Sequence, residues 1–289
     1  MTNSNSASLI KFATLSSIIS VSLIIIVKLI GWWFTNSLTI VASLADSFLD
    51  IATSLVNFFA ARYALQPPDK EHRFGHGKAE DIAVFFQSAF FVASGVFLIV
   101  VSIKRAIFPV VTENNLFGIY IMAFSIIITI CLIAIQQYVI KKTNSLIVKA
   151  DHLHYFTDLL SNMAVIIALY IGYKWQNNFV DPAFTALIAI YILYNAGHLM
   201  KHSFKNLMDH EFDDDEKEKI LQMIKNNPEV MGIHNLKTRY AGNNPFIQFH
   251  LEMSGEMKLI EAHRITEDIE NKIMELFPNA DVIIHQDPR

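Results

Sequence analysis

Two aspartates spaced one helical turn apart stand inside a strongly apolar segment of the chain. Asp46 and Asp50 both fall within residues 38–63, a run long and apolar enough to cross a lipid bilayer. Their i,i+4 spacing puts both carboxylates on one face of a helix. Carboxylates at membrane depth are rare, and they generally face a cavity and mark an ion path. The ordinary alternative is that these are packing or helix-end acids. It would explain a single aspartate, but two carboxylates one turn apart repel each other unless a cation lies between them.

A second pair with the same spacing occurs in the segment ADHLHYFTDLLSN, residues 150–162. His154 and Asp158 would share one face of that helix. Packed against the two aspartates, this face would surround one point with three carboxylates and one imidazole, a set that suits Zn²⁺ or a close relative. Asp151 and His152 fall near the start of the segment, so we interpret them as ordinary helix-start residues.

The chemistry of such a cluster predicts an exchange of metal for protons. Three carboxylates at low dielectric repel each other and lose hydration, so the empty site is expected to hold protons. A metal ion requires deprotonated ligands, and its binding therefore releases those protons. The four residues indicate a metal/proton antiporter.

Six segments are long and apolar enough for spanning helices, which need about 20 residues each. Turn residues such as Pro67-Pro68 and Asn177-Asn178 separate them. The expected spans are Phe12–Phe34, Leu38–Tyr63, Asp81–Ile107, Leu116–Ile140, Ala150–Tyr173 and Asp181–Met200. Ten basic residues lie on the side of the two termini and three on the other side. Because basic loops stay in the cytoplasm, we expect both termini to be cytoplasmic.

Charge changes abruptly near residue 209. Residues 1–208 hold 14 Lys and Arg against 10 Asp and Glu, whereas residues 209–289 hold 9 against 17. We therefore predict a transmembrane transport domain over residues 1–208 and an acidic soluble domain over residues 209–289. The single cysteine, Cys131, excludes an intrachain disulfide, and its apolar neighbours predict a buried side chain.

The soluble segment shows an α-β-β-α-β order, typical of a small two-layer α+β domain. Helices are predicted at about residues 214–225 and 258–276, and strands at GIHNLKTRYAG, FIQFHLEM and ADVIIHQD. One histidine on a strand is usually structural, whereas several with an acid near the ends of three elements indicate metal binding. The candidate ligands are His234, His250, His263, His285 and Asp287.

The loop after the second span offers another group of metal-ligating side chains. Asp69, His72 and His76 stand close together in PPDKEHRFGHGKAE, residues 67–80. They could hold a metal ion. Histidine and aspartate are also ordinary in exposed polar loops, so both interpretations stand.

Four motifs in these segments resemble those of the cation diffusion facilitator family, and in particular its FieF-type zinc, iron and cadmium efflux pumps. They are SLADSFLDIATS, DKEHRFGHGKAE, DHLHYFTDLLSN and DVIIHQDP. The resemblance extends over nearly the whole chain. It implies a homodimer in the bacterial inner membrane, Y-shaped, with an all-α six-helix bundle and a cytoplasmic metallochaperone-like α+β domain in each subunit. It also implies export of Zn²⁺, Cd²⁺ or Fe²⁺ against protons, control by the cytoplasmic domain, no enzymatic activity and no nucleic-acid partner.

The resemblance assigns roles to individual residues. It implies a transport site, a loop site, a binuclear site at the interface of the cytoplasmic domains, and a salt bridge at the dimer waist. The transport site would consist of Asp46, Asp50, His154 and Asp158, and the loop site of Asp69, His72 and His76. The binuclear site would consist of His234, His250, His263, His285 and Asp287, and the salt bridge would join Lys78 to Asp209. Asp287 would bridge two ions, one held by His234 and His250 and the other by His263 and His285.

Three other functions are weighed against this one. A membrane metalloenzyme would need a motif such as HExxH, which does not occur in the sequence. A passive channel would more naturally place rings of charge on a symmetry axis, whereas these ligands can gather within one chain. A manganese transporter would suit an all-carboxylate set better than one that contains His154.

Overall fold

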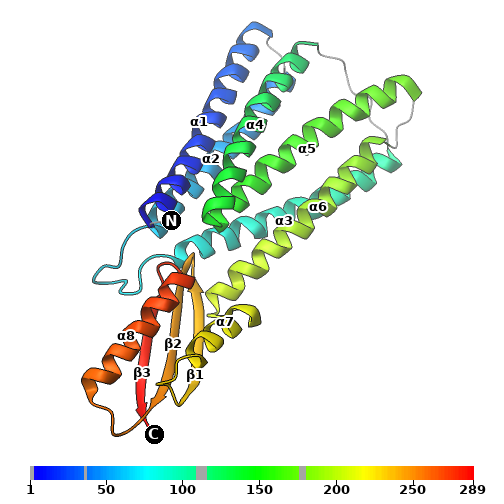
Figure 1. The fold of residues 1–289 in the computed structure, drawn as a ribbon. Helices are drawn as coiled ribbons and strands as arrows, with labels where there is room; N and C mark the ends of the chain where they lie inside the picture. The colour runs from blue at the N-terminus through cyan, green and yellow to red at the C-terminus, as the bar shows by residue number, and fades with distance from the viewer. Residues whose placement is uncertain (1–2, 36–37, 109–115, 176–179) are drawn as a thin grey trace.

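The computed structural model describes residues 3–35, 38–108, 116–175 and 180–289. Six long helices come first and a smaller α+β tail follows (Figure 1). The long helices are α1 (Asn3–Thr35), α2 (Leu38–Ala64), α3 (Lys78–Ile107), α4 (Leu116–Thr143), α5 (Leu146–Trp175) and α6 (Val180–Leu207). They confirm the predicted helical segments in number and order, and most of them extend past the predicted ends.

Within the described residues, α1, α3, α4 and α6 are long and apolar enough to cross a membrane. The other two long helices, α2 and α5, hold the four predicted ligands of the transport site. Large apolar side chains such as Phe86, Phe97 and Leu187 are about two-thirds exposed, at 69%, 65% and 63%. Many exposed large apolar side chains on helices of this length are typical of a surface that faces lipid.

The helices are arranged so that α3 and α6 form a close pair, and α5 packs between α4 and α6 (Figure 1). Gly95 permits the close approach of the pair, because a Cβ there would lie only 2.8 Å from Leu193 Cγ. α2 packs chiefly on α1, and α1 also contacts α4. Cys131 on α4 is exposed, so the prediction of a buried thiol was wrong. In a bilayer protein an apolar run includes the outward-facing side chains too.

The tail has the predicted α-β-β-α-β order. Its elements are α7 (Asp214–Lys225), β1 (Gly232–Ala241), β2 (Asn244–Met253), α8 (Leu259–Leu276) and β3 (Asp281–Pro288). The sheet order is β1-β2-β3, with β1 antiparallel and β3 parallel to β2. Along β2 the buried residues alternate with less buried ones. Ile247, Phe249 and Leu251 face the core with α7 and α8, and the intervening residues, His250 and Glu252 among them, lie on the other face.

The turn between β1 and β2 packs against the first turn of α3. Gly242 has a φ of +59°, which glycine adopts without strain, and a Cβ there would lie 2.6 Å from Gly77 O. The buried carboxylate of Asp81 accepts hydrogen bonds from Gly242 N and from Asn206 Nδ2 on α6, both at 2.8 Å. The tail is thereby attached to the ends of both α3 and α6.

Candidate metal centres

The first candidate centre lies between α2 and α5. His154 Nε2 is 3.1 Å from Asp50 Oδ1 and 3.7 Å from Asp158 Oδ2. Zinc bonds of about 2.0–2.1 Å place neighbouring ligand atoms of a tetrahedral site about 3.3 Å apart. The two distances from His154 lie close to this value, and one ligand atom from each of the three side chains lies within 4.8 Å of the other two, so the group could hold a metal ion. The side chain of Asp46, the fourth predicted ligand, lies outside the described residues.

The imidazole of this centre is held from α3. Phe91 is buried, and its ring stacks on that of His154 at 5.8 Å between centroids with 18° between planes. The contact packs one face of the imidazole against α3, while its Nε2 lies beside the two carboxylates. Sequence reasoning missed Phe91, because one phenylalanine in a phenylalanine-rich helix carries no distinguishing pattern.

Asp151 is not the helix-start residue that the sequence predicted. It is the sixth residue of α5 and is buried, at 2% exposure. Its carboxylate accepts hydrogen bonds from Ser17 Oγ at 2.5 Å, Asn57 Nδ2 at 2.9 Å and Gln136 Nε2 at 2.8 Å. The helix begins one turn earlier than predicted, which places Asp151 inside the bundle.

The second candidate centre is the loop cluster. Asp69 Oδ1 lies 3.5 Å from His72 Nδ1, and Asp69 Oδ2 lies 3.3 Å from His76 Nε2. The backbone N–H groups of His72 and Glu71 donate to Asp69, so the pKa of this carboxyl lies below its usual range and the group stays charged. His76 is almost fully buried beside Tyr63, while the other two are exposed. The structure thus brings all three predicted loop residues together.

The third candidate centre is on the open face of the tail sheet. Strand register places His234 opposite His250 and His250 opposite His285, so three imidazoles form one row across the sheet. A bulge between His234 and Lys237 shifts the β1 register beside the row. Asp287 reaches the row from β3: its Oδ2 lies 2.9 Å from His250 Nδ1 and 3.2 Å from His234 Nε2, and its Oδ1 lies 3.1 Å from His285 Nε2.

The carboxylate of Asp287 is thus shared by three imidazoles. Its hydrogen bond with His250 is the main cause that holds its pKa below the usual range. His263, the fifth predicted ligand, lies exposed on α8 and is not in the group that the described chain gathers. Glu252, which sequence reasoning missed, pairs with His234 Nδ1 at 3.0 Å and with Arg289 at 2.8 Å. The sequence could have identified Glu252, because it stands two residues after His250 and therefore on the same face of the strand.

Comparison with known proteins gives matches over both parts of the chain. Residues 14–208 match the family described as cation efflux transmembrane domain, and residues 212–289 match the one described as cation efflux protein, cytoplasmic domain. The chain belongs to the cation diffusion facilitator family.

Relatives in this family cover almost the whole chain. Protein p34 of Rickettsia prowazekii is 47% identical over 287 residues, covering 99% of this chain and 95% of its own. The cation-efflux pump FieF of Citrobacter koseri is 40% identical over 281 residues, covering 97% and 93%. A solved structure of CzrB, a candidate zinc transporter, is 31% identical and covers 27% of this chain and 98% of its own, with a TM-score of 0.26. The chain is therefore a multi-pass membrane protein of a cation efflux family.

The ion pair that the resemblance to cation diffusion facilitators implied is present within one chain. Lys78 Nζ lies 2.9 Å from Asp209 Oδ1. Arg239 of β1, which sequence reasoning missed, reaches the same oxygen at 3.0 Å. Burial opposes ionisation of Asp209, but the hydrogen bonds from Lys78 and Arg239 outweigh it and hold the pKa of this carboxyl below its usual range.

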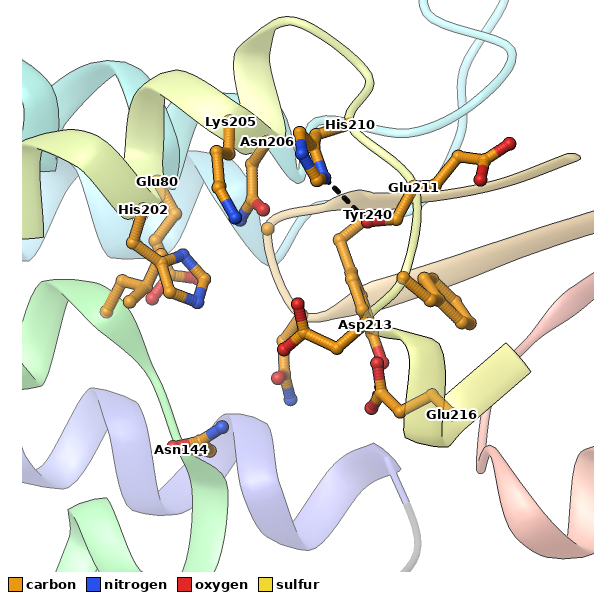
Figure 2. A pocket seen from close by; sticks show the side chains of 14 residues that line it. Glu80, Asn144, His202, Lys205, Asn206, His210, Glu211, Asp213, Glu216 and Tyr240 are labelled. Atoms are coloured by element: carbon orange, nitrogen blue, oxygen red, sulfur yellow. Dashed lines mark hydrogen bonds between the residues drawn. The ribbon is translucent and has the colours of Figure 1, made fainter. Parts of the chain in front are cut away.

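A pocket of about 320 Å³ lies between the membrane helices and the tail of this family member (Figure 2). Its lining includes His202 and Lys205 from α6, Asp213 and Glu216 at the start of α7, and Tyr240 from β1. Several of these groups already have partners, since Tyr240 donates a hydrogen bond to Glu216 at 3.1 Å. None of the predicted metal ligands is among its lining residues.

Proposed function

We propose that this protein exports divalent metal cations from the cytoplasm in exchange for protons. One observation carries the proposal: Asp50 of α2 meets His154 and Asp158 of α5 at the spacing of metal ligands. Asp46, one turn before Asp50, would complete a four-ligand site. The relatives named as cation-efflux pumps support the same activity.

Zn²⁺ is the cargo that we expect first, with Cd²⁺ and Fe²⁺ as further candidates. Carboxylate and imidazole ligands together are typical of zinc sites, whereas harder ions prefer oxygen ligands alone. Protons are the expected counter-ions because the same ligand atoms bind either protons or metal. A site that binds the two in competition exchanges them when it faces each side of the membrane in turn.

The proposed setting is the inner membrane of a bacterium, with both termini in the cytoplasm. The excess of basic residues on the side of the termini supports this orientation. Residues 1–208 would form the transport domain, and residues 209–289 a cytoplasmic domain that dimerises and senses metal. The binuclear site with His263, His285 and Asp287 as ligands to its second ion stays a prediction.

Uptake into vesicles tests the proposal. The full-length protein is reconstituted into liposomes, a pH gradient is imposed, and initial rates are measured for Zn²⁺, Cd²⁺, Fe²⁺ and Mn²⁺ over a range of concentrations. We expect saturable Zn²⁺ transport that collapses with the gradient. Asp50→Ala and Asp158→Ala should abolish it, whereas Asp268→Ala, which removes a surface acid of α8, should not. Transport that is unaffected by the gradient, or normal rates in either ligand variant, would contradict the proposal.

A further inference from the structure

Asp151 is tied to three other helices at once. Its partners are Ser17 on α1, Asn57 on α2 and Gln136 on α4, and all four side chains are buried, at 2% exposure or less. A buried carboxylate without partners is costly, and so is each buried donor that loses its acceptor. The four groups therefore specify one arrangement of α1, α2, α4 and α5.

Polar contacts also connect α2 and α5 directly, in a ladder along the two helices. This ladder consists of three hydrogen-bonded pairs: Asp50 with His154 at 3.1 Å, Ser54 with Tyr155 at 2.5 Å, and Asn57 with Asp151 at 2.9 Å. On α2 the three residues are spaced by four and three positions, so they lie on one face. The candidate metal centre is one end of this ladder and Asp151 is the other.

The ladder matters because, among the residues that the structure describes, α2 and α5 make most of their contacts with other helices. α2 packs chiefly on α1, and α5 packs chiefly on α4 and α6. In a bilayer the hydrophobic effect does not hold two helices in one register, so packing and interhelical hydrogen bonds must do so. A shift of one helical turn, about 5.4 Å, would separate Asp50 from His154.

We propose that Asp151 is a positioning residue that sets the register between α2 and α5 and thereby the metal affinity of the centre formed by Asp50, His154 and Asp158. This rests on the proposed function, because it takes that centre as the transport site. Both oxygens of Asp151 are engaged by the three donors. It acts through the geometry of the ligands and not as a ligand itself.

The test compares two deletions that each remove one hydrogen bond to the same carboxylate. Asn57→Ala cuts the bond between α2 and α5, whereas Ser17→Ala cuts the bond to α1 and leaves the ladder intact. The full-length variants are compared in proteoliposomes for KM and maximal rate of Zn²⁺ uptake, and in detergent for thermal unfolding. Loss of support behind metal ligands typically weakens metal affinity about 10- to 100-fold. We expect Asn57→Ala to raise KM at least about tenfold and Ser17→Ala less than about twofold.

An exchange variant keeps the test decisive even if the deletions weaken folding. Asn57→Asp alone sets two carboxylates against each other, which should raise KM. In the double variant Asn57→Asp/Asp151→Asn the amide and the carboxylate trade helices, so the α2–α5 hydrogen bond returns. The remaining oxygen at position 151 can still accept from Ser17 and Gln136. We expect the double variant to regain a KM within about threefold of wild type, by analogy with intact support of a metal site.

The outcomes separate this inference from the proposed function. Normal transport by Asp158→Ala would overturn the transport site itself. If Asp158→Ala is inactive while Asn57→Ala keeps the wild-type KM, the site stands and the positioning role fails. Equal KM changes in Asn57→Ala and Ser17→Ala, or a double variant no better than Asn57→Asp, would also overturn the positioning role, since a general loss of packing does not distinguish the partners of Asp151.

Discussion

Lys78 Nζ and Asp209 Oδ1 lie 2.9 Å apart, which joins the first residue of α3 to the chain just after the end of α6. Asp209 adopts a φ of +54°, so the backbone turns there, and the same carboxylate oxygen receives Arg239 from the tail sheet. One half-exposed acid thus connects the close helix pair to the cytoplasmic domain proposed for this family member.

Replacing Asp209 should loosen that connection in a pH-dependent way. Because Lys78 and Arg239 hold its folded-state pKa below the usual value, the stabilisation is present above the unfolded pKa of about 3.9 and is lost as pH falls through the folded pKa. Exposed pairs contribute about 0.2–1 kcal/mol each, so the effect of Asp209→Asn should be small. Thermal unfolding in detergent from pH 7 to pH 3 measures it.

The matched control for Asp209→Asn is Asp268→Asn, which removes one acid of a local pair on α8. We expect the difference between wild type and Asp209→Asn to shrink below about pH 4. A difference that stays constant, or that grows toward low pH, would show that the ion pairs of Asp209 do not stabilise the folded protein.

The packing of the β1–β2 turn on α3 gives a second prediction. Gly242→Ala would place a methyl group 2.6 Å from Gly77 O at a φ of +59°, and such strain costs on the order of 1–3 kcal/mol. Gly197→Ala is the control, because a Cβ on this α6 glycine meets no described atom within 4 Å and alanine favours helix. Hydrogen exchange should therefore speed up at the start of α3 only in the Gly242 variant. Equal protection in both variants would mean that this turn does not hold the two parts together.

The order of the elements could be predicted from the sequence because each long helix is one apolar run between turn residues. The register between helices could not. Asp151 looked like a helix-start acid because the sequence pattern does not show that α5 begins at Leu146. Its partners Ser17 and Gln136 lie on two other helices, α1 and α4, so no local spacing connects them with Asp151. Long-range polar contacts leave no periodic signal.

The candidate centres were predictable to the extent that their residues share a local spacing. His154 and Asp158 are one turn apart, and Asp69, His72 and His76 are close in one loop, so the structure brings each set together. The row of His234, His250 and His285 depends on strand register and on the bulge in β1, which alternation alone does not specify. His263 was included because it is one of several histidines in the tail, and within the described chain it lies apart from the row.

A third prediction concerns metal selectivity at the α2–α5 centre. His154→Asp would replace its only imidazole by an oxygen ligand, which suits harder ions. The variant should gain Mn²⁺ uptake and lose preference for Zn²⁺ in the same vesicle assay. Phe91→Leu is a useful comparison, because it removes the ring stacked on His154 but leaves the ligand in place. If His154→Asp transports the same metals in the same ratio as wild type, selectivity is set by the shape of the cavity and not by ligand type.

The last prediction concerns the acidic tail. Residues 209–289 hold 9 basic and 17 acidic residues, so two tails in the proposed dimer should repel each other at low metal. Metal at the row of His234, His250 and His285 would neutralise part of this charge and favour the close arrangement, as for any ligand that prefers one state. The coupling to transport should be modest, on the order of 1–3 kcal/mol.

Distances between spin labels on the two tails, measured while Zn²⁺ is added, decide the matter. We expect the labels to approach, and we expect the midpoint to move to higher Zn²⁺ at low pH because protons compete for the imidazoles. Asp287→Ala is the sharpest variant, since Asp287 contacts all three histidines of the row. It should blunt the approach while leaving Zn²⁺ uptake at the α2–α5 centre intact. Labels that stay at one distance throughout the titration in an intact dimer would show instead that the tail is a constitutive dimerisation module whose metals are structural.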